Sequence, residues 1–150
     1  MADSGAQRAL RAVHDSLASA LTGRADVRPV WGPELAGDDA PAAAALRAAG
    51  ASWEWTALGF AGRSFWDLHV GILPVGSGYT VGLHWTPAVD DDVLSWAQTA
   101  VPGGARQFAA AAGEHQLMCA DAGGITVHSA QSAAAAAIGI ASRVLARDSG

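Results

Sequence analysis

The stretch FWDLHVGILPVGSGYTVGLHWTP, residues 65–87, decides the fold. Two runs of alternating apolar and polar residues flank Gly76 and Ser77, and a short turn of small residues between such runs is typical of an antiparallel hairpin. Folding the chain about this turn places Leu68 opposite Trp85. The hairpin is therefore the centre of the predicted sheet.

The alternation divides the hairpin into two faces. The apolar face, expected to pack on the core, comprises Trp66, Leu68, Val70, Ile72, Tyr79, Val81, Leu83 and Trp85. The opposite, polar face comprises Asp67, His69, Gly71, Thr80, Gly82, His84 and Thr86. A register shift of one residue would expose the whole apolar face, so the sequence specifies this register strongly.

The other elements are predicted outward from the hairpin. Trp53–Phe60 reads as a third strand, which makes a three-stranded meander over 53–86, and a loop at Ala61–Ser64 would place Trp53 and Trp55 on the apolar face. A second hairpin is predicted over 115–129 with its turn at Asp121–Gly124, after a short helical turn at Arg106–Ala112. Apolar spacing and capping residues predict helices near 4–22, 41–49, 90–100 and 129–147. The fold class is α+β: one domain, 1–150, in which N-terminal, middle and C-terminal helices pack on an antiparallel sheet.

The order of these elements resembles the type III secretion chaperone-like fold. The resemblance covers most of the chain and rests on element order alone, so no functional residue is carried over from it. Members of that fold are dimeric binding proteins. The resemblance therefore implies a binding or chaperone-like module that forms a homodimer.

Composition narrows the classes of function. The formal net charge is −5, and the basic residues are nine scattered arginines with no lysine, which argues against nucleic-acid binding and against an anionic membrane surface. Without lysine there is neither a phosphate-binding loop of the Walker type nor Schiff-base chemistry. Cys119 is the only cysteine, and no signal peptide or membrane-spanning run is recognised. A cytoplasmic protein is expected.

The polar face of the hairpin carries the most specific candidate site. His69 and His84 lie directly opposite one another, and paired residues hold their Cβ atoms about 4.5–5.5 Å apart, close enough to share a metal ion. Glu54 on the neighbouring strand is a candidate third ligand, and Asp67 is a diagonal alternative. Two histidines and a carboxylate form the ligand set of catalytic zinc and non-haem iron sites. Without metal, one histidine could act as a general base.

Two other interpretations of this face stay open. Histidine, threonine and aspartate are also typical of an ordinary solvated sheet surface. Alternatively, Gly71 and Gly82, which face one another, form a shallow floor that admits a helix or a ligand close to the sheet. No cofactor is predicted, although a divalent metal at His69 and His84 is possible.

Two further groups of residues are candidates. Trp53, Trp55, Trp66 and Trp85 are expected on one face, where they could line a pocket for a flat or apolar ligand or simply form core. A second cluster comprises His115, Cys119, Asp121 and His128. With a turn at Asp121–Gly124, Cys119 would lie diagonally across from His128 as a thiolate–imidazole pair, or be a buried apolar residue.

Three functions follow from these features. The first is a binding or chaperone-like module that holds a protein or a small apolar ligand. The alternative is a small enzyme that performs histidine-based acid–base or metal-assisted chemistry on a compact organic substrate, with His69, His84, Glu54 and Asp67 as its catalytic group. The third is a structural subunit that docks through alanine-rich helix faces at 42–49 and 133–141.

Overall fold

A computed structural model describes residues 5–48, 50, 52–76, 78–85, 96, 105–112 and 115–149. Its strands form one antiparallel sheet in the order β1-β2-β3-β4-β6-β5. The strands are β1 (Val27–Trp31), β2 (Thr56–Phe60), β3 (Leu68–Val75), β4 (Gly78–Trp85), β5 (Ala105–Ala112) and β6 (His115–Val127). The helices are α1 (Gly5–Ala20), the 3-10 helix η1 (Gly32–Leu35), α2 (Pro41–Ala48) and α4 (Ala130–Ser149). The predicted α+β class with an antiparallel sheet is confirmed.

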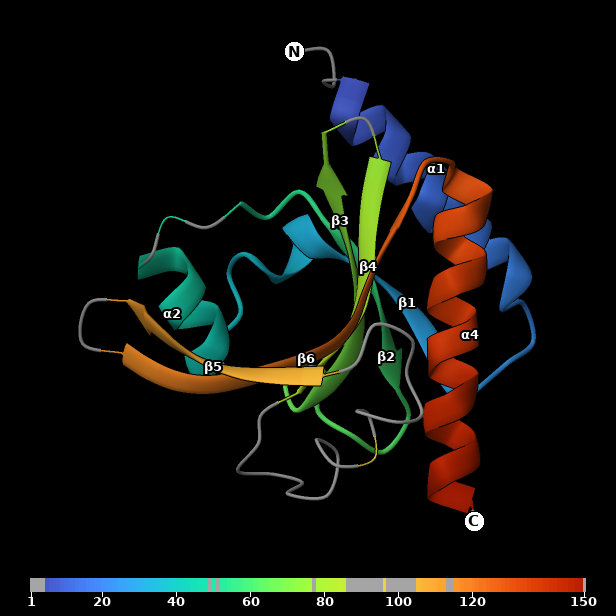
Figure 1. Ribbon diagram of the computed structural model, residues 1–150. Coiled ribbons are helices and arrows are strands. Elements are labelled where there is room, and N and C mark those ends of the chain that lie inside the picture. The colour runs from blue at the N-terminus through green and yellow to red at the C-terminus, as the bar shows by residue number, and fades with distance from the viewer. Residues whose placement is uncertain are drawn as a thin grey trace.

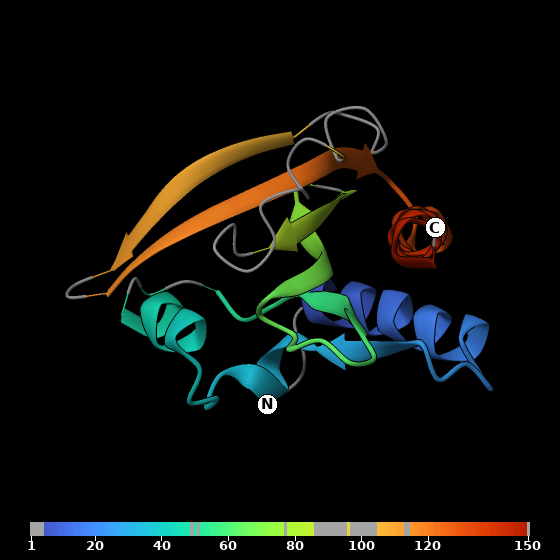
Figure 2. The same ribbon diagram turned by 90° about the horizontal axis from the view of Figure 1, so that it is seen from below.

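The helices lie on opposite sides of the sheet. Figures 1 and 2 show α1 and α4 side by side against one face, while α2 lies on the other side, near the long β5–β6 ribbon. No helix in the described part of the chain is long and apolar enough to cross a membrane. The predicted helix at 90–100 lies outside the described residues, apart from Trp96.

The main core fills the space between the sheet and the pair α1 and α4. The helical stripe of α1 is buried as its spacing predicts: Leu10, Val13, Leu17 and Leu21. α4 contributes Ala137, Ile140, Ala141 and Val144, whereas Ile138 and Leu145 lie at its edge. Ser129 caps α4, since its Oγ accepts a hydrogen bond of 3.0 Å from the Ser132 backbone N–H.

The central hairpin has the predicted register. β3 and β4 pair from Leu68 with Trp85 to Val75 with Gly78, so His69 faces His84 and Gly71 faces Gly82. Gly76 takes a positive φ of 56° in the turn, a conformation that glycine adopts without strain.

The predicted face of the preceding strand is wrong. β2 begins at Thr56 rather than Trp53, and Thr56 pairs with Ile72. The predicted loop, 61–64, is too short, because the observed connection runs to Asp67, three residues further. An odd change in loop length reverses the face of every side chain. Thr56 and Leu58 therefore face α1 and α4, while Trp55 and Ala57 face away.

The second hairpin is built differently from its prediction. β6 is one continuous strand from His115 to Val127, and it pairs with β5 at 105–112, the stretch expected to be helical. Cys119 lies opposite Phe108 rather than in a hairpin with Thr126. Cys119 lies within β6 and His128 lies just after its end. The two residues are therefore separated along one strand instead of facing each other across a hairpin. The predicted thiolate–imidazole cluster is wrong.

Candidate functional site

One row of paired residues crosses the whole sheet, and its two histidines lie on the side away from α1 and α4. We call this side the histidine face. In strand order, the row consists of Arg28, Gly59, His69, His84, Asp121 and Arg106. Direct pairing in adjacent strands is what brings such residues, far apart in sequence, onto one line.

Hydrogen bonds fix the tautomers of the two central histidines. His69 Nδ1 lies 3.0 Å from the carbonyl oxygen of Phe65, and His69 Nε2 lies 3.3 Å from His84 Nδ1. Because a carbonyl oxygen only accepts, His69 Nδ1 carries the proton and neutral His69 presents a lone pair at Nε2. His84 Nδ1–H then donates to that lone pair. The site is a relay from His84 through His69 to a backbone carbonyl.

Gly71 makes room for the His84 ring. A Cβ at Gly71 would lie 2.8 Å from His84 Cε1 and 2.9 Å from His84 Nδ1, closer than carbon atoms approach. Both Gly71 and Gly82 are buried. The predicted shallow floor at Gly71 is therefore already filled, by an imidazole ring of the protein itself.

Burial keeps His69 neutral. The loss of solvent around its ring, followed by the nearby charge of His84, lowers the pKa of His69 from 6.5 to about 3, and the bond to the Phe65 carbonyl offsets this only in part. His69 keeps some exposed surface, and both of its nitrogens have hydrogen-bond partners. At neutral pH it is an acceptor and a positioning group rather than a cation.

The carboxylates predicted beside the pair belong to the segments that precede β2 and β3. Glu54 precedes β2 by two residues, and Asp67 lies in the turn before β3, where its N–H donates to the Ser64 carbonyl. Among the side chains that the structure describes, no three of His, Cys, Asp or Glu gather as a metal site. Glu54 and Asp67 thus do not complete a ligand set with His69 and His84.

The aromatic cluster, which we define as Trp53, Trp55, Phe65 and Trp66, adjoins the histidines on the same face. Its rings lie 5.1–6.3 Å apart between centroids, and the His69 ring stacks on Phe65 at 4.2 Å. Trp85 belongs instead to the main core on the other face. The prediction that Trp85 shares a pocket with the other three tryptophans is wrong.

The aromatic cluster also has a structural role. It packs against Leu35 of η1 and Val30 of β1. Trp66 Nε1–H donates a 2.7 Å hydrogen bond to Asp38 Oδ2, just before α2. Trp53 and Trp66 nevertheless remain partly exposed beside the histidine pair.

A second polar contact, which the sequence did not predict, joins α1 to the sheet on the core side. His14 Nδ1 lies 2.9 Å from the hydroxyl of buried Thr56, which in turn donates to the Val30 carbonyl at 3.0 Å. Burial, followed by the charge of Arg11, lowers the pKa of His14. The sequence signal for this contact was the position of His14 next to the buried stripe of α1. His14 anchors α1 to the sheet.

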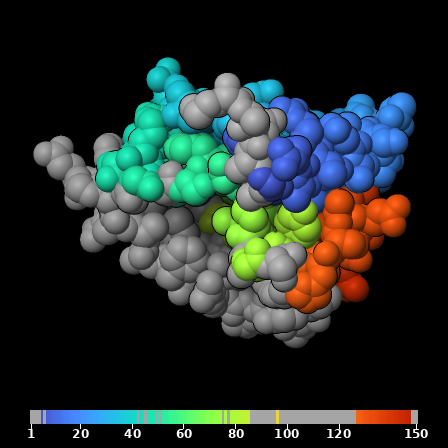
Figure 3. All heavy atoms as spheres, turned by 90° about the horizontal axis from the view of Figure 1, so that it is seen from above, coloured from blue at the N-terminus to red at the C-terminus, as the bar shows by residue number. Residues whose placement is uncertain are grey.

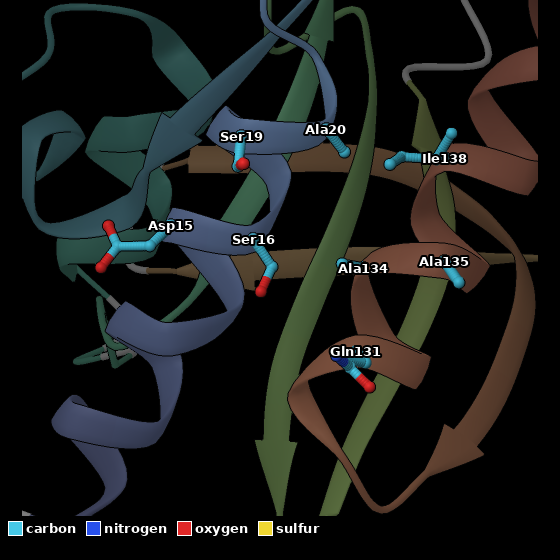
Figure 4. A pocket seen from close by; sticks show the side chains of 8 residues that line it. All are labelled: Asp15, Ser16, Ser19, Ala20, Gln131, Ala134, Ala135 and Ile138. Carbon is cyan, nitrogen blue, oxygen red and sulfur yellow. The ribbon is translucent and has the colours of Figure 1, made fainter.

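An open groove of about 550 Å³ lies between α1 and α4. Figure 4 shows Ala20 of α1 pointing toward Ile138 of α4, with Ser16 and Ala134 further along. In the space-filling view, the tip of the β3–β4 hairpin reaches the surface between the two helices (Figure 3). Alanine and serine side chains line most of the groove, together with Gln131, Ile138 and one exposed carboxylate, Asp15. The groove therefore offers fewer reactive groups than the histidine face.

Comparisons with protein-family models, with curated proteins and with solved structures gave no match.

Proposed function

We propose that this protein is a binding module for a small aromatic acid, which it holds on the histidine face. The single observation that carries the proposal is the position of the His69 ring. One side of it stacks on Phe65 of the aromatic cluster, and its Nε2 takes part in the hydrogen bond with His84. Hydrogen-bonding groups beside partly exposed aromatic rings are what a small-molecule site needs for affinity and orientation.

A positive charge on the same row supports an acidic ligand. The Arg28 guanidinium lies over Gly59, where its carbon would be 3.3 Å from a Cβ at that position, and Gly59 pairs directly with His69. Arginine is suited to recognise a carboxylate through two parallel hydrogen bonds. The ring of the ligand would then lie along Trp53 and Trp66.

The experiment compares benzoate with benzyl alcohol, which lacks the charge. Chelator-treated protein is titrated with each, and binding is followed by NMR at the histidine rings and the tryptophan indoles. We expect benzoate to shift the NMR signals of His69, His84 and Trp66 and to bind more tightly than the alcohol. Arg28→Gln should remove that preference, while the matched control Arg143→Gln, on α4, should retain it. Equal shifts with both probes, or shifts confined to other residues, would overturn the proposal.

The second candidate is a small acid–base enzyme for isomerisation, cyclisation or dehydration of a compact substrate. The relay from His84 to the Phe65 carbonyl favours it, because a base oriented by a second group is a recurrent catalytic arrangement. Hydrolysis of p-nitrophenyl acetate probes this reactivity. We expect His84→Ala to slow it and His128→Ala, a control with an exposed ring, to leave it unchanged; equal rates for His84→Ala and wild type would count against catalysis.

Two wider expectations from the sequence remain part of the proposed function. A homodimer that also holds a protein partner rests on the resemblance of the predicted element order, and a cytoplasmic location rests on the single cysteine. Light scattering across a range of protein concentrations tests the dimer, and a mass that stays monomeric throughout would remove it.

A further inference from the structure

The fold orients the imidazole ring of His14, which lies on α1. Its Nδ1 lies 2.9 Å from the hydroxyl oxygen of Thr56, and that hydroxyl donates to the Val30 carbonyl at 3.0 Å. Because the hydroxyl proton is used in the bond to Val30, Thr56 Oγ1 can only accept from His14, so His14 Nδ1 carries a proton. Neutral His14 therefore has its lone pair at Nε2. Among the described residues, no hydrogen bond involves this second nitrogen.

Two other histidines lack this combination of a fixed tautomer and an unused lone pair. Both ring nitrogens of His69 have partners, the Phe65 carbonyl and the His84 ring. His128 has an exposed ring, and no hydrogen bond to the described residues fixes its tautomer. His14 thus offers a lone pair that the fold orients and that no described residue accepts.

The state of the His14 ring suits a nucleophile. Burial, followed by the charge of Arg11, lowers its pKa, so the ring is neutral at neutral pH and its lone pair is available. The charges of Asp15 and Glu34 act in the opposite direction and have smaller effects. The ring is nevertheless partly exposed, so a small reagent can reach it.

A guanidinium group lies close to the same ring. Arg11 and His14 are three residues apart on α1, a spacing that places them on one side of a helix. Both contact the indole of Trp31: the Arg11 guanidinium carbon lies 4.3 Å from its centroid, and the His14 ring lies 5.3 Å from it, centroid to centroid. Arg11 is exposed, and a guanidinium matches the geometry of phosphate oxygens.

We propose that His14 is a phosphorylation site, at which Nε2 accepts a phosphoryl group from a small phosphoryl donor. The Nε2 lone pair forms the new N–P bond, the bond from phosphorus to the leaving group breaks, and the leaving group departs with that electron pair. The proton on Nδ1 stays in its hydrogen bond to Thr56, which is a positioning residue, while Arg11 attracts the phosphoryl oxygens. The site lies on α1, on the core side of the sheet, and does not depend on the proposed organic ligand.

Potassium phosphoramidate, whose leaving group is ammonia, tests the site on the untagged chain, with N-acetylhistidine as a competitor in the same solution. 31P NMR distinguishes the two isomers of phosphohistidine, and mass spectrometry of peptides identifies the residue. We expect His14 to be the first residue modified, with Nε2 as the initial position. As the pH falls from 7.5 to 5.5, the rate at His14 relative to the competitor should rise by up to about 10-fold, because an ordinary imidazole becomes protonated over this range.

Variants separate the roles of the neighbouring residues. Thr56→Val removes the hydroxyl and should give both isomers as initial products, whereas Thr56→Ser keeps the hydroxyl and should restore Nε2 alone. Arg11→Gln should slow the reaction about 2- to 5-fold, the size of an exposed charge interaction. The matched control Arg143→Gln, on α4, should react as wild type does.

The wild-type chain decides the proposal independently of whether the variants fold. Modification of His128 or of the competitor before His14, or an initial product on Nδ1 of His14, would overturn the site. Initial reaction at Nε2 alone in folded Thr56→Val would overturn the positioning role of Thr56. Benzoate binding is measured at His69 and His84, so an unreactive His14 with benzoate binding intact would overturn this site and leave the proposed function standing. Reactive His14 without benzoate binding would do the reverse.

Discussion

The two faces of the central sheet differ in kind although the same strands supply both. The core face is aliphatic, and its central residues Val70, Ile72, Val81 and Leu83 have no exposed surface. The histidine face carries imidazole and indole rings that are only partly covered, with glycines where a ring must lie close to the backbone. Burial against α1 and α4 stabilises the fold, while the opposite face keeps polar atoms in defined positions. The comparison predicts that changes on the core face affect stability and that changes on the histidine face affect chemistry.

The largest effect is expected from a cavity on the core face. Leu83→Ala removes a fully buried side chain and should lower the free energy of unfolding by about 3 to 5 kcal/mol. Leu73→Ala, on the same hairpin but 39% exposed, should change it by less than about 0.5 kcal/mol. Urea unfolding measures both. Similar losses in the two variants would show that the faces are not as distinct as described.

A smaller effect is expected where the histidine face is crowded. Gly71→Ala places a methyl group against the His84 ring and should cost about 1 to 3 kcal/mol, with a displaced His84 resonance. The control Gly139→Ala adds the same methyl to α4, where nothing lies within 4 Å. It should stabilise the protein by up to about 1 kcal/mol. If Gly71→Ala were neutral and left His84 unmoved, the ring would not lie over β3.

The third effect concerns pH and is a slope rather than a single loss. Folding lowers the pKa of His69 below its ordinary value of 6.5, so below that value the unfolded chain takes up a proton that the folded chain does not. Stability should therefore fall as the pH drops from 6.5 toward 3, by up to about 1.4 kcal/mol per pH unit. His69→Gln should reduce this slope, leaving the part due to His14, whose pKa is also lowered. An identical slope in His69→Gln and wild type, measured by urea unfolding, would contradict the lowered pKa of His69.

The register of the hairpin could be predicted because both strands alternate strictly about one turn. That register alone brought His69 opposite His84 and Gly71 opposite Gly82. The face on which Trp55 lies could not be predicted. It depends on whether a glycine-containing loop ends at Ser64 or Asp67, and the sequence leaves both loop lengths open. Because the two loop lengths differ by an odd number of residues, Trp53 and Trp55 lie in the aromatic cluster instead of the expected core.

The ribbon of β5 and β6 shows a second limit. Alanine favours helices, so Ala109–Ala112 indicated a helical turn, and Gly123 with Gly124 indicated a hairpin turn. Pairing with neighbouring strands overrides both preferences. The position of Asp121 beside His84 follows from a pairing between distant segments that also contains a register shift after Val81. No local pattern in the sequence encodes it.

The tautomer of His69 is the most direct test of the account's central claim, that the histidine face holds a relay ordered by the fold. Long-range 15N NMR of the metal-free protein assigns the protons on the ring nitrogens. The account predicts a proton on Nδ1 of His69, a lone pair at Nε2, and a ring that stays neutral as the pH falls well below 6.5. A proton on Nε2 together with an ordinary titration near 6.5 would contradict it.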